Sequence, residues 1–180
     1  MQLKDYIKVY EDVLSPEDIS SIMEDSKQDD CWIKAPIANN PEDPNVFVEE
    51  VRKTDLMHFD EKHQSYTMLH KKNEEVCLRY MEEFPDLMLY TSTGHDLLKY
   101  EVGGYFKRHT DAYAMAHRTV SLIYLINEDY GGGEIDLLDG EVVLKPKAGT
   151  CVVFPSSFQY PHEIKAVTSG TRWSIVSWSV

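Results

Sequence analysis

Apolar residues recur at helical spacing near the start of the chain, in the segment LSPEDISSIMEDSKQ. Ser15 can act as the N-cap of a helix, and Pro16 suits its first turn. Two acidic residues follow, at the end of the helix where the dipole favours negative charge. Ile19, Ile22 and Met23 then fall on one face, so the pattern predicts an amphipathic helix that starts after Ser15.

Helical spacing returns between about residue 60 and residue 84, and it predicts a second helix that ends before Pro85. Its predicted core residues are Val76, Cys77, Tyr80, Met81 and Phe84. Between the two helices, residues 31–56 contain three prolines and two adjacent asparagines, which predicts a long loop with one short strand. Loops of this length often serve as lids or binding loops.

The pattern changes after residue 96, where short runs rich in β-branched and aromatic residues alternate with turn signals. These runs are LLKYEV, TVSLIYLI, GEIDLL, EVVLKP, GTCVVFP, HEIKAV and RWSIVSWSV. Two helices followed by several strands predict an α+β chain whose second half is an antiparallel sandwich or barrel. The glycines at 131–133 lack the lysine and helix of a phosphate-binding loop, so a hairpin turn is predicted there.

The length of 180 residues predicts a single domain over 1–180, with a helical lead-in and loop over about 1–95 and a β-core over about 96–180. No apolar run approaches the roughly 18–20 residues of a membrane span. The first residues, MQLKDYIKVYEDV, are charged, so no signal peptide is expected. Three cysteines without metal-binding spacing favour a reducing, cytoplasmic location.

The formal net charge is −13, and it is unevenly distributed. Residues 96–180 hold 10 acidic and 8 basic residues, a net −2, which leaves 21 acidic and 10 basic residues, a net −11, in residues 1–95. An acidic surface repels phosphate groups, so no nucleic acid is expected as a partner, and no membrane partner is predicted. The basic residues of VRKT, at 51–54, are candidate contacts for a peptide, or they offset nearby glutamates.

The segment KRHTDAYAMAH places His109 two residues before Asp111. Side chains two apart on a strand share a face, so both could bind one metal ion, and His162, just before a later strand, could complete the set. Two histidines and one carboxylate favour non-haem Fe(II), whereas a simple hydrogen-bonded pair of His109 and Asp111 is the alternative. His117 lies in a polar loop and is predicted to be exposed. Four further histidines in polar surroundings are predicted to be surface or capping residues: His58, His63, His70 and His95.

An arginine, Arg172, lies inside the apolar pattern of the strand RWSIVSWSV. A guanidinium in such a place must reach solvent, pair with an acid such as Glu134, or bind an anion. Ser174 lies on the same face, so a guanidinium and a hydroxyl are both available to a carboxylate. A diacid could therefore bind the metal at one end and Arg172 at the other, and 2-oxoglutarate is such a diacid.

These motifs together resemble the Fe(II)/2-oxoglutarate-dependent dioxygenases, in particular the prolyl-4-hydroxylase-like branch. The similar segments are LLKYEVGGYFKRHTD, RTVSLIYLINEDYGGGEIDLL, PKAGTCVVFPSSFQYPHEI and TRWSIVSW, which cover roughly residues 97–180. The resemblance implies that His109, Asp111 and His162 are the catalytic iron ligands. It also implies that Arg172 binds the distal carboxylate of 2-oxoglutarate and that Tyr100 lies over this cosubstrate near the metal.

The chain departs from the family pattern at Leu125, where the family often has a tyrosine that also faces the distal carboxylate. The neighbouring Tyr124 has the opposite strand parity and should face away. Either the register slips locally or Ser174 supplies the hydroxyl.

The resemblance implies a double-stranded β-helix, or jelly-roll, core with N-terminal helices packed on one sheet. It implies hydroxylation of a C–H bond, with a peptidyl proline as the favoured target, and conversion of 2-oxoglutarate and O₂ to succinate and CO₂, with ascorbate as reductant. A free amino acid or another small molecule is the alternative substrate. A non-catalytic binding module and a hydrolytic zinc site are the competing hypotheses, but the first would normally lack a ligand and the second leaves Arg172 without a role. The sequence carries no signal for an oligomeric state.

Overall fold

The computed structural model describes residues 1–28, 31–37, 46–90, 92–113 and 117–180. Its elements, in chain order, are a 3-10 helix at Leu3–Tyr6, β1 (Lys8–Tyr10), α1 (Pro16–Asp25), β2 (Trp32–Lys34), β3 (Arg52–Lys53), β4 (Asp55–Phe59), α2 (Tyr66–Glu83), β5 (Ser92–Tyr100), β6 (Tyr105–His109), β7 (Val120–Leu125), β8 (Gly131–Gly132), β9 (Ile135–Leu137), β10 (Val142–Leu144), β11 (Cys151–Pro155), β12 (His162–Ile164), β13 (Val167–Ser169) and β14 (Arg172–Ser179).

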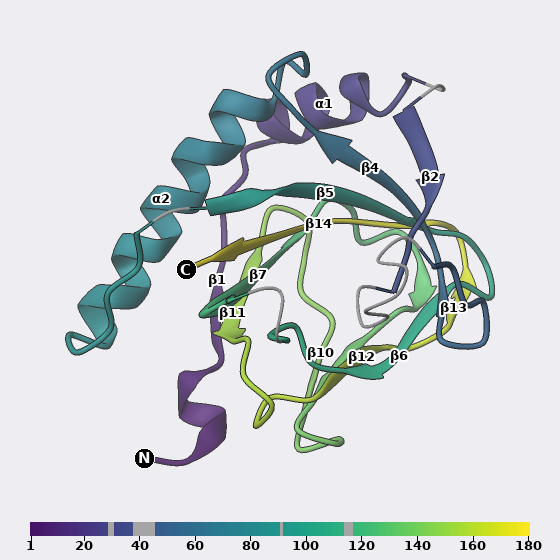
Figure 1. Cartoon of the computed structure of the whole chain (residues 1–180). Helices are drawn as coiled ribbons and strands as arrows, with labels where there is room; N and C mark the ends of the chain where they lie inside the picture. Colours follow the sequence, from purple (N-terminus) through teal and green to yellow (C-terminus); the bar gives the residue numbers. More distant parts are fainter. Residues whose placement is uncertain (29–30, 38–45, 91, 114–116) are drawn as a thin grey trace.

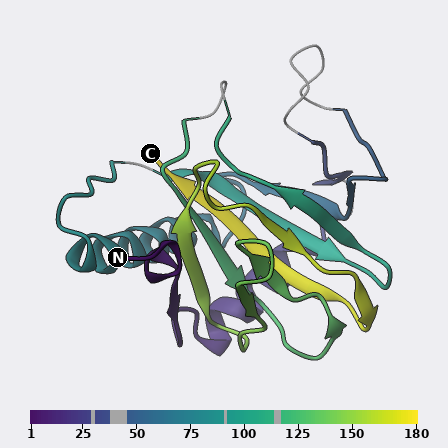
Figure 2. The same cartoon turned by 90° about the horizontal axis from the view of Figure 1, so that it is seen from below.

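Two antiparallel sheets face each other, in the manner of a jelly roll, and both helices lie on the outer side of the larger one (Figures 1 and 2). The larger sheet has seven strands in the order β1-β11-β7-β14-β5-β4-β2, and the smaller has five in the order β10-β9-β12-β6-β3. A short ribbon pairs β13 with β8. Each of the seven strand-like runs in the sequence overlaps one of these strands, so that part of the prediction is confirmed, although β5 begins earlier than its run.

The first predicted helix, α1, is confirmed with its N-cap. The backbone N–H of Asp18 donates to Ser15 Oγ at 3.2 Å, and the backbone N–H of Ser15 donates to Asp18 Oδ2 at 2.9 Å. This reciprocal pair satisfies two donors that a helix start leaves open. Ile22 is fully buried, and Ile19 and Met23 pack against the same core, as the helical spacing predicts.

The second helix, α2, begins at Tyr66, about a turn and a half later than predicted. The buried carboxylate of Asp25, at the end of α1, explains where it starts. Asp25 Oδ2 accepts from the backbone N–H of Ser65 at 2.9 Å, and Oδ1 accepts from that of Gln64 at 3.1 Å. The start of α2 is therefore set by a contact across the fold, which local periodicity could not predict.

Two hydrophobic clusters lie on the two faces of the seven-stranded sheet. The outer cluster joins this sheet to α1 and α2 and includes Ile22, Leu69, Val76, Tyr80, Leu97, Leu122 and Tyr124. The inner cluster lies between the two sheets and includes Leu98, Tyr100, Ile123, Leu125, Leu137, Phe154 and Ile164. Alternate residues of one strand thus serve two separate cores. No helix in the described part of the chain has the length and apolarity to cross a membrane.

The predicted long loop over residues 31–56 contains more regular structure than expected. Within its described part lie β2, β3 and the start of β4, instead of one short strand. β2 pairs with β4, and β3 pairs with β6. These strands are stabilised by distant partners, so the proline-rich local sequence did not reveal them. The stretch 38–45, the centre of the predicted lid, lies outside the described residues.

The predicted hairpin turn at residues 131–133 is wrong. Gly131 and Gly132 form β8, which pairs with β13, and the chain passes here from β7 in the larger sheet to β9 in the smaller one. At Gly132, φ is +67°, and an added Cβ would lie 2.2 Å from the carbonyl oxygen of Ala166. Glycine is therefore required by close backbone approach between two short strands, not by a tight turn.

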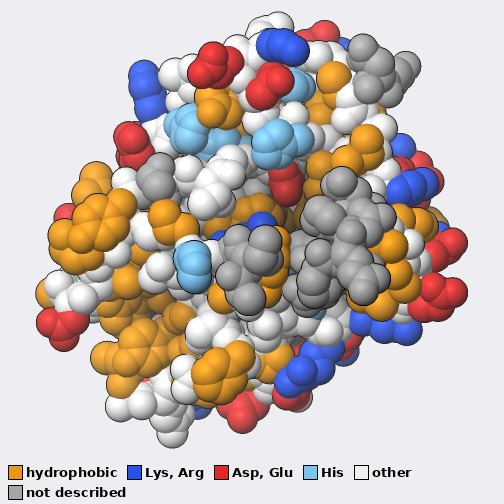
Figure 3. All heavy atoms as spheres, in the orientation of Figure 1, with side chains coloured by type: hydrophobic (Ala, Val, Ile, Leu, Met, Phe, Trp, Pro, Cys, Tyr) orange, Lys and Arg blue, Asp and Glu red, His pale blue; other side chains and the backbone are white. Residues whose placement is uncertain are grey.

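The prediction that His95 is a surface or capping residue is wrong, because it is buried. His63 is also buried, but its Nδ1 accepts from the backbone N–H of Asp60 at 3.1 Å, which is a capping-type hydrogen bond in the turn before α2. Figure 3 shows other histidine side chains gathered at the surface. On β5, His95 alternates with Asp96 and faces the helices, so its polar sequence neighbours point to the other side of the sheet. His95 Nδ1 lies 2.6 Å from Ser177 Oγ. Burial, aided by His70 and His58, lowers the pKa of His95 to about 3.

This buried imidazole makes folding sensitive to acid. The folded-state pKa lies below the ordinary 6.5, so the unfolded chain binds more protons between these values, and the free energy of unfolding falls as pH drops below about 6.5. We expect His95 to cost on the order of 2 kcal/mol between pH 7 and pH 5. Urea unfolding of wild type and His95→Gln at both pH values measures this difference. The exposed His117→Gln is the control, and equal acid sensitivity of His95→Gln and wild type would contradict the assignment.

Candidate metal centre and its cavity

A cavity of about 440 Å³ opens between the two sheets. One wall comes from β5, β7 and β14, and the other from β6 and β12, with loop residues beside them. The side chains that line it carry four arginines, two aspartates and two histidines: Arg52, Arg108, Arg118, Arg172, Asp96, Asp111, His109 and His162. The three predicted metal ligands and Arg172 therefore share one space.

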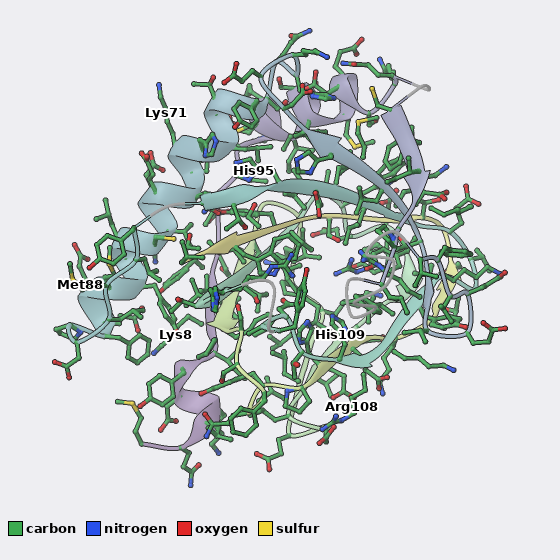
Figure 4. All side chains as sticks on the ribbon, viewed as in Figure 1. Lys8, Lys71, Met88, His95, Arg108 and His109 are labelled. Carbon is green, nitrogen blue, oxygen red and sulfur yellow. The ribbon has the colours of Figure 1, made fainter. Side chains whose placement is uncertain are left out.

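His109, Asp111 and His162 lie together, with one potential ligand atom from each within 4.8 Å of the others. His109 ends β6, as Figure 4 shows, and His162 begins β12 directly opposite it in the sheet. Asp111 lies just beyond the end of β6 instead of on the strand as predicted. Its Oδ1 lies 3.5 Å from His109 Nε2, and its Oδ2 lies 3.7 Å from His162 Nε2.

Both histidines are oriented so that Nε2 is available as a ligand atom. His109 Nδ1 lies 2.8 Å from the carbonyl oxygen of Lys107, and His162 Nδ1 lies 3.2 Å from that of Tyr160. A carbonyl can only accept, so each Nδ1 carries the proton and each Nε2 presents a lone pair. Burial, with His109 nearby, lowers the pKa of His162 to about 4, which keeps it neutral and able to bind a metal ion.

The carboxylate of Asp111 is oriented by two donors that sequence reasoning missed. Ser121 Oγ donates to Oδ2 at 2.6 Å, and Trp178 Nε1 donates to the same oxygen at 3.0 Å. Burial would raise the pKa of Asp111, but His162, His109 and the Ser121 hydroxyl outweigh it and hold that pKa well below its usual range. The side chain is therefore a fixed anion. Trp178 could have been found from strand parity, because it shares a face with Arg172.

This donor set fits a divalent ion such as Fe(II). Two imidazoles and one carboxylate lie together, which is the donor set of the facial non-haem iron sites. The rings are also packed: Phe106 stacks on His109 at 3.5 Å between centroids, and Phe154 meets His162 edge-on at 4.7 Å. Packing and hydrogen bonds of this kind keep ligands in place before the ion binds.

Arg172 is fully buried and lacks a full set of partners. Its Nε donates to the carbonyl oxygen of Gly133 at 3.0 Å, and its Nη1 donates to Ser174 Oγ at 2.6 Å. Its Nη2 is buried and has no hydrogen-bond partner among the described residues. The suggested pair with Glu134 does not form. An unpaired buried guanidinium nitrogen is costly, so it fits a site that an anion completes.

The register around Leu125 resolves the departure from the family pattern. Leu125 lies opposite Ser174 in the sheet and belongs to the inner cluster. Tyr124 faces the helices, where its hydroxyl donates to Asn73 Oδ1 at 3.0 Å, so the register does not slip. Ser174 Oγ contacts Arg172, the Tyr100 ring centroid lies 5.2 Å from its guanidinium carbon, and the hydroxyl of Tyr130 also interacts with Arg172.

The donors to Asp111 generate a prediction about metal affinity. Ser121→Ala or Trp178→Phe removes one hydrogen bond from Oδ2, so the carboxylate gains freedom that metal binding must then remove. We expect each change to weaken Mn(II) binding by about 10–100-fold. Calorimetric titration measures it, with Trp32→Phe on the distant β2 as the matched control. Unchanged affinity in both variants would show that Asp111 is positioned by other contacts.

The sequence has recognisable relatives over its β-rich half. Residues 95–180 match the model of the 2OG-Fe(II) oxygenase superfamily. A PKHD-type hydroxylase of Rippkaea orientalis is 34% identical over 95 residues, which cover 47% of this chain and 42% of that protein. Prolyl 3-hydroxylase 2 of Homo sapiens is 36% identical over 70 residues, which cover 36% of this chain and 10% of that protein. The chain spans less than half the length of these curated relatives.

Solved structures match nearly the whole chain. A prolyl hydroxylase of Trichoplax adhaerens, in complex with a hypoxia-inducible factor peptide, superposes with a TM-score of 0.81 at 19% identity and covers 97% of this chain and 83% of its own. A prolyl-4-hydroxylase of Pseudomonas putida gives a TM-score of 0.79 at 20% identity, with 97% and 92% covered. At this identity the likeness establishes the fold.

Proposed function

We propose that the chain, of which residues 95–180 match the model of the 2OG-Fe(II) oxygenase superfamily, is an Fe(II)- and 2-oxoglutarate-dependent oxygenase that hydroxylates a C–H bond of a peptidyl proline. One observation carries the proposal. The cavity that contains His109, Asp111 and His162 also contains a buried arginine nitrogen without a partner. A diacid could bind both ends of this cavity, with one carboxylate at the metal ligands and the other at the guanidinium group of Arg172.

In this proposal His109, Asp111 and His162 would hold Fe(II). The bound ion supplies the oxidative chemistry, in which 2-oxoglutarate and O₂ give succinate, CO₂ and a hydroxylated product. The chain's own part is to fix the tautomer and orientation of the imidazoles and to keep the carboxylate charged and in place. The carbonyls of Lys107 and Tyr160 and the donors Ser121 and Trp178 do this.

The proposed cosubstrate site lies at the inner end of the cavity. Arg172 Nη2 binds the distal carboxylate, Ser174 holds the guanidinium in place, and Tyr100 covers the chain of the diacid. Leu98 and Ile123, which line the cavity, supply an apolar wall that keeps water away from the reacting centre. Ascorbate serves as the external reductant that keeps the iron divalent.

The choice of a peptidyl proline rests on the relatives, several of which are prolyl hydroxylases by name. A free amino acid remains the second candidate, because the cavity of about 440 Å³ is of a size that encloses a small molecule. A hydrolytic zinc site would leave Arg172 Nη2 unsatisfied, so it accounts for less of the structure.

Succinate release tests the proposal directly. The full chain is incubated with Fe(II), ascorbate, 2-oxoglutarate and O₂, with and without a library of proline-containing peptides. We expect peptide-stimulated succinate and a mass gain of about 16 Da, one oxygen atom, on a responding peptide. Basal succinate without a peptide response would retain the oxygenase and exclude those peptides as substrates. No succinate and no bound iron would refute the proposal.

Two sets of substitutions separate the roles of the site. His109→Ala, Asp111→Ala or His162→Ala removes an iron ligand, so each variant should lose metal binding and succinate formation together. Arg172→Ala should weaken 2-oxoglutarate binding by about 100-fold or more and leave metal binding almost unchanged. Calorimetry with Mn(II) and then 2-oxoglutarate gives both affinities. Equal losses of both in Arg172→Ala would mean that this arginine has a structural role only.

A further inference from the structure

Two arginines in the cavity wall, Arg52 and Arg118, are not used by the proposed oxygenase chemistry. Both are half-buried, whereas Arg172 is fully buried, so they lie nearer to solvent than the proposed cosubstrate site. Arg52 belongs to β3, which pairs with β6. Arg52 is therefore on the strand beside β6, which ends at His109, and Arg118 comes after the loop that follows β6.

Each of these guanidinium groups is held by one backbone carbonyl and by aromatic side chains. Arg52 Nη1 donates to the carbonyl oxygen of Pro36 at 3.1 Å, and its guanidinium carbon lies 4.4 Å from the centroid of Phe106. Arg118 Nη1 donates to the main-chain carbonyl of Asp111 at 3.2 Å, and the guanidinium carbon of Arg118 lies 3.5 Å from the centroid of the Trp178 ring. The side chains are fixed in advance, with further N–H groups left over.

The two aromatic rings also touch the metal ligands. Phe106 stacks on His109, and Trp178 donates to Asp111. The ring of Phe106 therefore lies between Arg52 and the proposed iron ligand His109, and the ring of Trp178 connects Arg118 to the proposed ligand Asp111. Any group that reaches both guanidinium groups comes close to the reacting centre.

Neither arginine has a carboxylate within salt-bridge distance among the described residues. Two other charged groups of the cavity wall are already paired: Arg108 with Asp139, and Asp96 with His58 Nδ1 at 2.6 Å. Arg52 Nε is buried without any hydrogen-bond partner. The cavity wall thus carries unmet positive charge.

That positive charge runs against the composition of the chain. The whole chain has 31 acidic and 18 basic residues, but the cavity wall has four arginines and two aspartates. Unpaired, desolvated like charges cost stability, so their presence favours a ligand that neutralises them.

We infer that Arg52 and Arg118 form a clamp for a carboxylate of the substrate, so that the oxidised carbon belongs to an anionic molecule or an anionic segment of a peptide. The guanidinium fork matches a carboxylate with two parallel hydrogen bonds. The carboxylate has three possible sources: an acidic side chain beside the target proline, the C-terminus of a peptide, or a free amino acid. This inference rests on the proposed function, because it concerns the substrate of the same site.

Matched ligand pairs test the inference and separate these sources. The full chain, loaded with Mn(II) and saturating 2-oxoglutarate so that Arg172 is occupied, is titrated by calorimetry. The first pair is acetyl-Gly-Pro-Glu-amide against acetyl-Gly-Pro-Gln-amide. The second is acetyl-Gly-Pro acid against its amide, and the third is L-proline against L-prolinamide. We expect the carboxylate member of at least one pair to bind about tenfold tighter or more.

Variants locate any preference on the two arginines. Arg52→Gln and Arg118→Gln should each reduce the preference to about threefold or less, and the double variant should abolish it. Arg108→Gln is the matched control, because Arg108 also lines the cavity but is paired with Asp139, and it should keep the full preference. Arg52 lies on β3, and Arg118 lies in the loop before β7. If one single variant fails to fold, the other still measures the contribution of its arginine to the carboxylate preference.

The outcomes distinguish this inference from the proposed function. Equal binding of charged and neutral members, no binding of any carboxylate, or a preference that survives the double variant would overturn the clamp. Basal succinate formation in the same preparation would leave the oxygenase standing in that case. If Mn(II) and 2-oxoglutarate fail to bind, the titrations are repeated on the chain alone, where an arginine-dependent carboxylate preference would support the clamp without the oxygenase.

Discussion

The pairing of β6 with β12 is the constraint on which the rest of the site depends. It places His109 directly opposite His162, although 52 intervening residues separate them in the chain. Neither strand is long or strongly apolar, and each is held between neighbours in the five-stranded sheet. The hydrogen bonds of this ladder therefore bring two imidazoles into one site before any ion contributes binding energy.

The arrangement of the larger sheet complements this. The side chains on one face of its central strands pack against the helices, and those on the other face line the space between the two sheets. The polar chain from Tyr124 through Asn73 to Ser179 joins α2 to β7 and β14 behind the cavity. Buried hydrogen bonds of this kind specify one position for the strands, so the helical half supports the chemistry without entering it.

Much of the site could be predicted from the sequence because its signals are local or follow strand parity. The spacing of His109 and Asp111, the arginine within an apolar strand, and the outward direction of Tyr124 are of this kind. What could not be predicted depends on distant partners. The start of α2 depends on Asp25, β3 depends on β6, and the burial of His95 depends on which face of β5 meets the helices. Short strands, polar by composition, form because other strands pair with them.

Strand β14 carries Arg172, Ser174 and Trp178 on its cavity face, and it carries Ile175 and Ser177 on the helix face. A substitution in it changes one side chain, but one inserted or deleted residue would exchange the two faces beyond that point. Arginine would then meet the helix core, and isoleucine would meet the cavity. The strand can therefore vary in composition, within limits, but its length is fixed, and surviving length changes among related chains should lie in the connecting loops instead.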